Sequence, residues 1–264
     1  MPSTPSQKLI LYDIPSTSEI GAWSPNTWKA RLVLNIKELP YETIWVEYPD
    51  IKPTCLRIGA APTATVQKPD GTSEAQYTLP VLQDPNTGAV ISDSFDIAVY
   101  LEDTYPDTLA LFPPGSRALL YLFSETWFEK VGMALWFPLA IAGADKMHAS
   151  SREYYVRTKS AIVGKPMTEF RPQGDAGEKV WTDALAALSQ VRQWIDKNGT
   201  GDKAKYVLGE TFSYGDVFIV GWLAYYRSIV GVSSREWGDL MAADGGRWAR
   251  LATDFDEHGW FKVD

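Results

Sequence analysis

The sequence predicts two domains, an α/β domain over residues 1–112 and an all-helical domain over residues 116–264. Strand and helix patterns alternate in the first part, whereas only helical periodicity follows the segment 111–115, which is rich in Pro and Gly. A chain of 264 residues is long enough for two ordinary domains with a substantial core.

The first domain is expected to begin with a buried strand and a helix. The apolar run at residues 9–13 has the length of a buried parallel strand. A helix should begin at Ser24 and Pro25, because a hydroxyl followed by proline is typical of a helix start. Pro40 should end this helix before a second strand at residues 43–46.

A second helix, a long loop and a β-hairpin complete the first domain. We expect the helix at residues 51–58 and a long irregular loop at residues 60–76, which in a compact domain is either functional or an insertion. Two short apolar strands, at residues 79–82 and 89–91, flank a polar turn and lead into a third helix. This βαβαββα order matches a thioredoxin-like domain.

The second half of the chain shows helical spacing of apolar residues. Two faces repeat every three or four residues; they consist of Leu120, Phe123, Trp127, Val131 and Leu135, and of Val180, Ala184, Leu188, Val191 and Ile195. Near the end, Ser213 stands three residues before Asp216 and directly ahead of an apolar helix. This spacing is that of a capping box, whose function is to start a helix.

Composition argues against several classes of partner. The chain has 25 basic and 33 acidic residues, a net charge of −8, and no Lys/Arg cluster, so nucleic acid and anionic membranes are poor candidates. Apolar runs are too short for a membrane span, and the first residues lack the apolar core of a signal peptide, so we expect a cytoplasmic protein. Cys55 is the only cysteine, and His148 and His258 are the only histidines, so no disulfide and no metal site are expected.

Two motifs resemble those of cytosolic glutathione transferases. Leu-Pro-Val-Leu at residues 79–82, followed by Asp93 and Ser94, resembles their glutathione site, and the box at Ser213 recurs in their helical domain. Within that superfamily, residues 24–31, 45–51 and 58–63 resemble the fungal FuA class, whose members are serine-type relatives of bacterial lignin β-etherases. The resemblance implies glutathione as co-substrate, no metal and a homodimer.

The resemblance assigns Ser24 as the catalytic residue. A free thiol has a pKa of about 8.5, so lowering it by about two units requires roughly 2.7 kcal/mol of thiolate stabilisation. A hydroxyl hydrogen bond to an anion supplies about 1.5–3 kcal/mol, and a helix amino terminus adds about 0.3–1 kcal/mol. The alternative is that Ser24 only caps its helix.

Two other side chains compete with Ser24. Some classes use a tyrosine near the end of the first strand, where Tyr12 stands, although an apolar strand favours a core role for it. Omega-like relatives have a cysteine in place of Ser24, but Cys55 lies in the second helix region, where we expect a buried structural thiol and weak disulfide exchange.

The same resemblance assigns the glutathione-binding residues. Asp93 and Ser94 should bind the γ-glutamyl group, since a carboxylate, a hydroxyl and a positive helix end suit a zwitterion. Pro80, if cis, leaves the backbone of Leu79 turned outward to pair with the cysteinyl amide. For the glycyl carboxylate, three candidates remain open: Lys52, Lys68 and Gln76.

A hydrophobic second substrate is expected between the domains. Trp127, Phe128, Trp136 and Phe137 supply aromatic rings, although a stripe at helical spacing is more often core than pocket. The expected activity is conjugation of glutathione to aromatic or hydrophobic electrophiles, with peroxide reduction as a further activity. The alternatives are a ligandin that binds wood-derived polyphenols, a β-etherase-like enzyme, and a non-catalytic assembly module.

Overall fold

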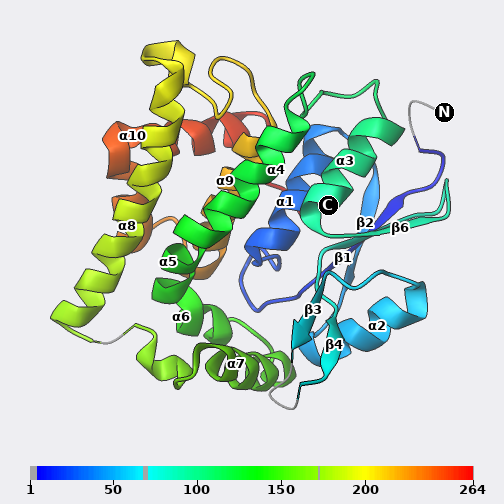
Figure 1. Cartoon of the computed structure of the whole chain (residues 1–264), viewed down its shortest axis with the longest axis horizontal. Helices are drawn as coiled ribbons and strands as arrows, with labels where there is room; N and C mark the ends of the chain where they lie inside the picture. Colours follow the sequence, from blue (N-terminus) through cyan, green and yellow to red (C-terminus); the bar gives the residue numbers. More distant parts are fainter. Residues whose placement is uncertain (1–4, 68–70, 172, 264) are drawn as a thin grey trace.

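A computed structural model describes residues 5–67, 71–171 and 173–263 and confirms the expected α/β domain followed by helices (Figure 1). The α/β part contains, in chain order, β1 (Leu9–Asp13), α1 (Pro25–Ile36), β2 (Tyr41–Trp45), α2 (Ile51–Ile58), β3 (Ala64–Gln67), β4 (Ser73–Gln76), β5 (Val81–Asp84), β6 (Ala89–Ser92) and α3 (Ser94–Thr104). The helical part contains α4 (Arg117–Trp127), α5 (Met133–Trp136), α6 (Ala140–Asp145), α7 (Ala149–Val163), α8 (Asp175–Ile195), α9 (Tyr214–Val230) and α10 (Arg235–Glu257).

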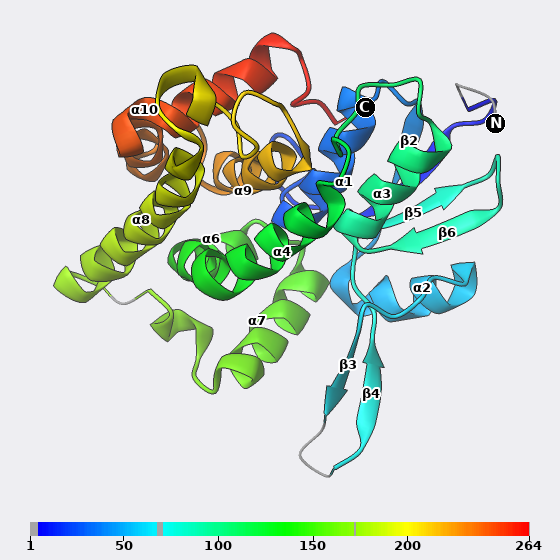
Figure 2. The same cartoon turned by 45° about the horizontal axis from the view of Figure 1, so that its top comes forward.

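Four strands form a mixed sheet in the order β2-β1-β5-β6. β1 and β2 are parallel, whereas β1 with β5 and β5 with β6 are antiparallel. Helices α1 and α3 cover one face of the sheet and α2 lies on the other (Figure 2). This is the thioredoxin-like arrangement that the order of elements predicts, and the first strand occupies the expected residues 9–13.

The expectation of an irregular loop at residues 60–76 is wrong. β3 and β4 pair as an antiparallel hairpin, with Ala64 opposite Gln76 and Gln67 opposite Ser73, and the hairpin projects away from the body of the molecule (Figure 2). Both strands consist largely of exposed residues without alternating apolar side chains, so hydrophobic periodicity gives no signal for them. Thr65 and Val66, which favour strands, are the local indication.

Helix α1 is the centre of the molecule, lying between α3 and α9 (Figure 2). Gly221 allows α9 to approach it closely, because a Cβ at that position would lie 2.6 Å from Lys29 Cγ and 3.0 Å from the Pro25 carbonyl oxygen. On another side of α1, the Asn35 amide donates to the carbonyl oxygens of Trp260 and Lys262 at 2.7 and 2.9 Å. Helix α1 is therefore fixed by the sheet, by the helical domain and by the end of the chain.

The periodic faces of the helical domain are confirmed as its core. All of the α4–α5 face is buried except Phe123, which is half-buried, and the α8 face is buried except for half-buried Val180. A π-helical turn at Phe128–Gly132 joins α4 to α5. The capping box is also confirmed: the Asp216 carboxylate accepts hydrogen bonds from the backbone N–H of Ser213 and of Val207, each at 2.9 Å.

Candidate functional site

Strand register brings the predicted site residues to one edge of the sheet. Val81 pairs with Ser92 and also with Tyr12 of β1, so residues 79–80, residues 93–94 and the end of β1 lie side by side. The loop after β1 then folds back, because Pro15 bridges to Ala22. This return places Ser24 at the same edge, although it is far from the other site residues in the sequence.

Ser24 stands at the amino end of α1 with its hydroxyl uncommitted. Its carbonyl oxygen accepts hydrogen bonds from Trp28 N–H at 3.0 Å and from the Thr27 hydroxyl at 3.2 Å. Its side chain forms no capping hydrogen bond, and within the described ranges the hydroxyl has no other partner. The local geometry therefore does not favour a purely capping role, because the Ser24 hydroxyl oxygen accepts no hydrogen bond from the N–H groups of the first helical turn.

The Leu79–Pro80 peptide bond is cis. Leu79 is buried as a side chain, but its backbone N–H and carbonyl oxygen have no hydrogen-bond partner in the part of the chain that the structure describes. A backbone N–H and C=O left free beside a strand end can pair with an extended peptide.

Asp93 and Ser94 begin α3. Asp93 has a φ of 78°, which is uncommon for a residue other than glycine, and its carboxylate accepts a hydrogen bond from Phe95 N–H at 2.7 Å. The Asp93 carboxylate remains exposed, whereas Ser94 is buried behind it. A carboxylate and a hydroxyl therefore stand together at a positive helix end.

The competing residues are engaged elsewhere. The Tyr12 hydroxyl donates to Gln83 Oε1 at 2.9 Å, and burial raises the pKa of this phenol. Cys55 is buried in α2, and burial raises the pKa of its thiol, which makes the reactive thiolate scarcer. Lys52 forms an exposed ion pair with Glu74 at 2.6 Å. Gln76 lies in the exposed hairpin, and Lys68 lies outside the described residues.

Family models match both halves of the chain. The model described as "Glutathione S-transferase, N-terminal domain" matches residues 23–104, and that described as "Glutathione S-transferase, C-terminal domain" matches residues 118–258. The chain belongs to the glutathione S-transferase family. It is thus a glutathione transferase family enzyme, as its motifs indicate.

Relatives match the transferase over nearly its whole length. The crystal structure of GSTFuA3 from Phanerochaete chrysosporium is 37% identical, covers 96% of this chain and 97% of that one, and has a TM-score of 0.86. A Ceriporiopsis subvermispora glutathione S-transferase, CsGST63524, crystallised in complex with glutathione, is 39% identical with coverages of 96% and 98% and a TM-score of 0.88. The glutathione S-transferase-like protein ustS of Aspergillus flavus is 28% identical over 270 residues, 95% of this chain and 91% of that protein.

The aromatic residues expected to line a second-substrate site differ in their exposure. Trp127 is fully buried against Phe218 and Trp222 of α9, which favours the core role, whereas the Phe128 side chain is 59% exposed. Phe137 packs half-buried against Phe170. Trp136, a further candidate, donates to the Tyr155 hydroxyl at 2.7 Å.

A cluster of rings beside Ser24 was not indicated by the sequence. Trp23 contacts Tyr48, Tyr155 and Tyr225, with ring centroids 6.0–6.4 Å away, so this cluster joins both domains of the transferase. The indole N–H of Trp23 and the hydroxyl of Tyr225 are buried without hydrogen-bond partners in the described residues. Only the position of Trp23 next to Ser24 could have suggested it.

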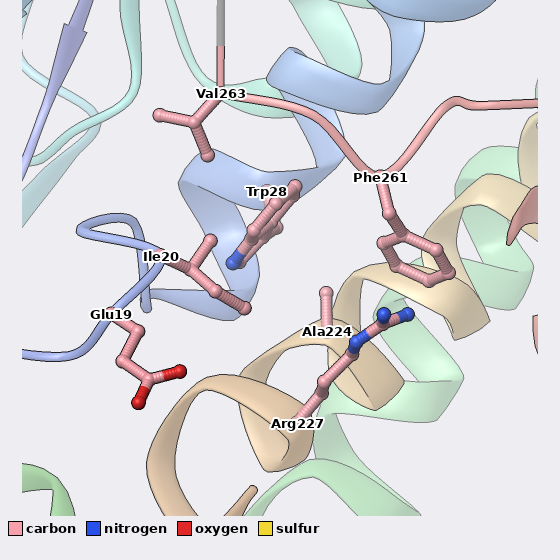
Figure 3. A pocket seen from close by; sticks show the side chains of 7 residues that line it. All are labelled: Glu19, Ile20, Trp28, Ala224, Arg227, Phe261 and Val263. Atoms are coloured by element: carbon pink, nitrogen blue, oxygen red, sulfur yellow. The ribbon is translucent and has the colours of Figure 1, made fainter. Parts of the chain in front are cut away.

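Two cavities of the transferase border the end of the chain. One, of about 340 Å³, lies between the β1–α1 loop, α1, α9 and the last residues, and is lined by Glu19, Ile20, Trp28, Ala224, Arg227, Phe261 and Val263 (Figure 3). The other, of about 460 Å³, lies beside the carboxyl end of α1 and is lined in part by Asn35, Tyr41 and Trp260. None of the predicted glutathione residues lines either cavity.

Neither a metal-ligand cluster nor a membrane-spanning helix occurs in the part of the chain that the structure describes. Over the described ranges, no three His, Cys, Asp or Glu side chains gather closely enough to hold a metal ion. In the same residues, no helix has both the length and the apolar character needed to cross a bilayer.

Proposed function

We propose that this transferase conjugates glutathione to hydrophobic, aromatic electrophiles, with the Ser24 hydroxyl stabilising the glutathione thiolate and with peroxide reduction as a further activity of the same thiolate. The observation that carries the proposal is the uncommitted Ser24 hydroxyl at the amino end of α1, on the sheet edge that also holds Leu79 and Asp93. The similarity to a relative crystallised with glutathione supports glutathione as the ligand.

The thiolate is the species that needs stabilisation. A donated hydroxyl hydrogen bond and the positive end of α1 together supply about 2–4 kcal/mol, enough to lower a thiol pKa by more than one unit. Ser24 is buried, so the hydrogen bond would be shielded from water and strengthened. Leu79, Pro80, Asp93 and Ser94 are the proposed glutathione-binding residues.

The test is an ultraviolet titration of the thiolate of bound glutathione. We expect the wild type to show a thiol pKa well below that of free glutathione, and Ser24→Ala to restore it and reduce conjugation at least about tenfold. Tyr12→Phe is the matched control, because it removes the competing hydroxyl and should leave the pKa depressed. An unchanged pKa in Ser24→Ala would sink the assignment.

The proposed second-substrate region is the ring cluster next to Ser24. Trp23 and Tyr225 carry buried N–H and O–H groups that lack partners among the described residues, and an oxygen-bearing aromatic substrate could accept from both. Phe128 is the candidate on the exposed side, whereas Trp127 and Phe137 would support the pocket from behind. An aryl ether bound there would make the β-etherase reaction possible, and release of the phenol would detect it.

The ligandin alternative is supported by the cavity of Figure 3. Its walls include the Trp28 and Phe261 rings, and the Arg227 guanidinium lies 4.9 Å from the Phe261 ring centroid. Planar polyphenols suit such walls. If this function is correct, quercetin should quench tryptophan fluorescence equally in wild type and Ser24→Ala, and less in Phe261→Ala.

A further inference from the structure

Lys29 is a buried cation that the proposed chemistry of Ser24 does not use. Its side chain is 5% exposed, and its Nζ lies 4.0 Å from the centre of the Phe218 ring of α9. Among the residues that the structure describes, it forms no ion pair and no hydrogen bond. Burial lowers the pKa of Lys29 to about 8, and Asp93 is the charge that opposes this shift, so Lys29 remains largely cationic at neutral pH.

Helix geometry directs this cation toward the glutathione site. Side chains on a helix tilt toward its amino end, so the long Lys29 chain extends back toward the first turn of α1, where Ser24 stands. The Phe218 ring that the amine faces lies next to Tyr214 at the start of α9, with ring centroids 6.4 Å apart. Asp93 does not neutralise it by contact, because no ion pair joins them in the described part of the chain.

Tyr214 provides a second observation at the same place. Its ring stacks on Phe112 and meets Phe95 of α3 edge-on, with centroids 5.4 and 5.3 Å away. Its hydroxyl is buried and has no hydrogen bond of normal geometry in the described residues. Burial raises the pKa of Tyr214, so its hydroxyl is neutral at ordinary pH, and the contact with Phe95 places the ring beside the first turn of α3.

These groups match the two charges of an amino-acid head group. Asp93 offers a carboxylate for an ammonium group, while Lys29 and the Tyr214 hydroxyl offer a desolvated cation and a free donor for a carboxylate. A buried charge and an unpaired buried hydroxyl are both costly unless a partner arrives. A ligand carboxylate would satisfy both at once.

We propose that Lys29 and Tyr214 are glutathione-binding residues that hold the α-carboxylate of the γ-glutamyl group, beside Ser94, while Asp93 holds its amino group. This inference rests on the proposed function, since it takes glutathione as the ligand. It adds two residues from α1 and α9 to a site otherwise built from the sheet edge and α3.

The test is calorimetric binding of three peptides to the full chain. They are glutathione, γ-aminobutyryl-cysteinyl-glycine, which lacks the α-carboxylate, and glutaryl-cysteinyl-glycine, which lacks the amino group. We expect Lys29→Met to weaken glutathione and the glutaryl peptide about 10- to 100-fold and to leave the aminobutyryl peptide unchanged. Tyr214→Phe, which keeps the ring, should show the same pattern at about 3- to 10-fold.

The controls separate this inference from the proposed function. Lys159→Met removes another desolvated lysine, which lies 5.7 Å from the Tyr155 ring centre, and should leave all three affinities unchanged. Equal weakening of all three peptides by Lys29→Met, or wild-type affinities in both variants, would overturn the inference while glutathione binding by the wild type stands. Failure of the wild type itself to bind glutathione would instead overturn the proposed function.

Discussion

Ser24 directly precedes α1 and Lys29 lies in its second turn, but burial costs the two side chains different amounts of folding free energy. Ser24 is buried but leaves only a neutral hydroxyl unused, whereas Lys29 places a charge in a largely desolvated position. A buried cation that meets an aromatic ring but, among the described residues, no carboxylate is the kind of local inconsistency that functional sites carry. The stability of the unliganded protein should therefore improve when this charge is removed.

We predict that Lys29→Met stabilises the unliganded protein by up to about 3 kcal/mol at pH 7, because the Lys29 pKa falls from 10.5 to about 8 on folding. The unfolded chain binds the extra proton between pH 8 and 10.5, so wild-type stability rises with pH in that window. The advantage of the variant should thus be complete below pH 8 and disappear toward pH 10.5. Urea unfolding of both proteins across this range measures it, and a destabilised variant at pH 7 would contradict it.

At the scale of elements, the start of α9 depends on one buried carboxylate. Asp216 accepts from two backbone N–H groups and from the Ser213 hydroxyl at 3.1 Å, and it closes the segment before α9 onto that helix. Because α9 supports α1 through Gly221, an intact α9 also sets the position of Ser24.

We predict that Asp216→Ala lowers the free energy of unfolding by about 2–4 kcal/mol, since it leaves two buried N–H groups unpaired. Ser213→Ala removes only the hydroxyl and should cost about 1 kcal/mol. Thermal unfolding of the two variants compares them directly. Equal losses would show that the carboxylate does not hold the backbone as described.

At the scale of the whole molecule, α4 presents apolar side chains to solvent. Leu119 and Leu122, three residues apart, are 62% and 58% exposed. We propose that this face contacts a second copy of the chain, as the resemblance to dimeric transferases implies. We also propose that the two domains divide at residues 113–115, although α1 and α9 pack them together.

We predict that the wild type has twice the chain mass of 29.4 kDa in solution and that Leu122→Glu converts it to a monomer. Ile162→Glu, at an exposed apolar position on α7, is the matched control and should remain dimeric. Size-exclusion chromatography with light scattering distinguishes them. A monomeric wild type, or dissociation by the α7 variant alone, would rule out this interface.

The sequence by itself determined the fold class and the capping box at Ser213, because periodicity, proline and turn residues act locally. The resemblance to glutathione transferases, and not any local pattern, assigned the proposed site residues of the sheet edge. Tertiary structure alone decided the rest. The hairpin at Ala64–Gln76 arises from exposed strands without a hydrophobic pattern, so pairing rather than composition defines it. The buried polar groups come from residues far apart in the sequence, namely Lys29 with Tyr214 and Trp23 with Tyr225. Only the packing of α1 against α3 and α9 brings such groups together, because burial depends on which surfaces meet.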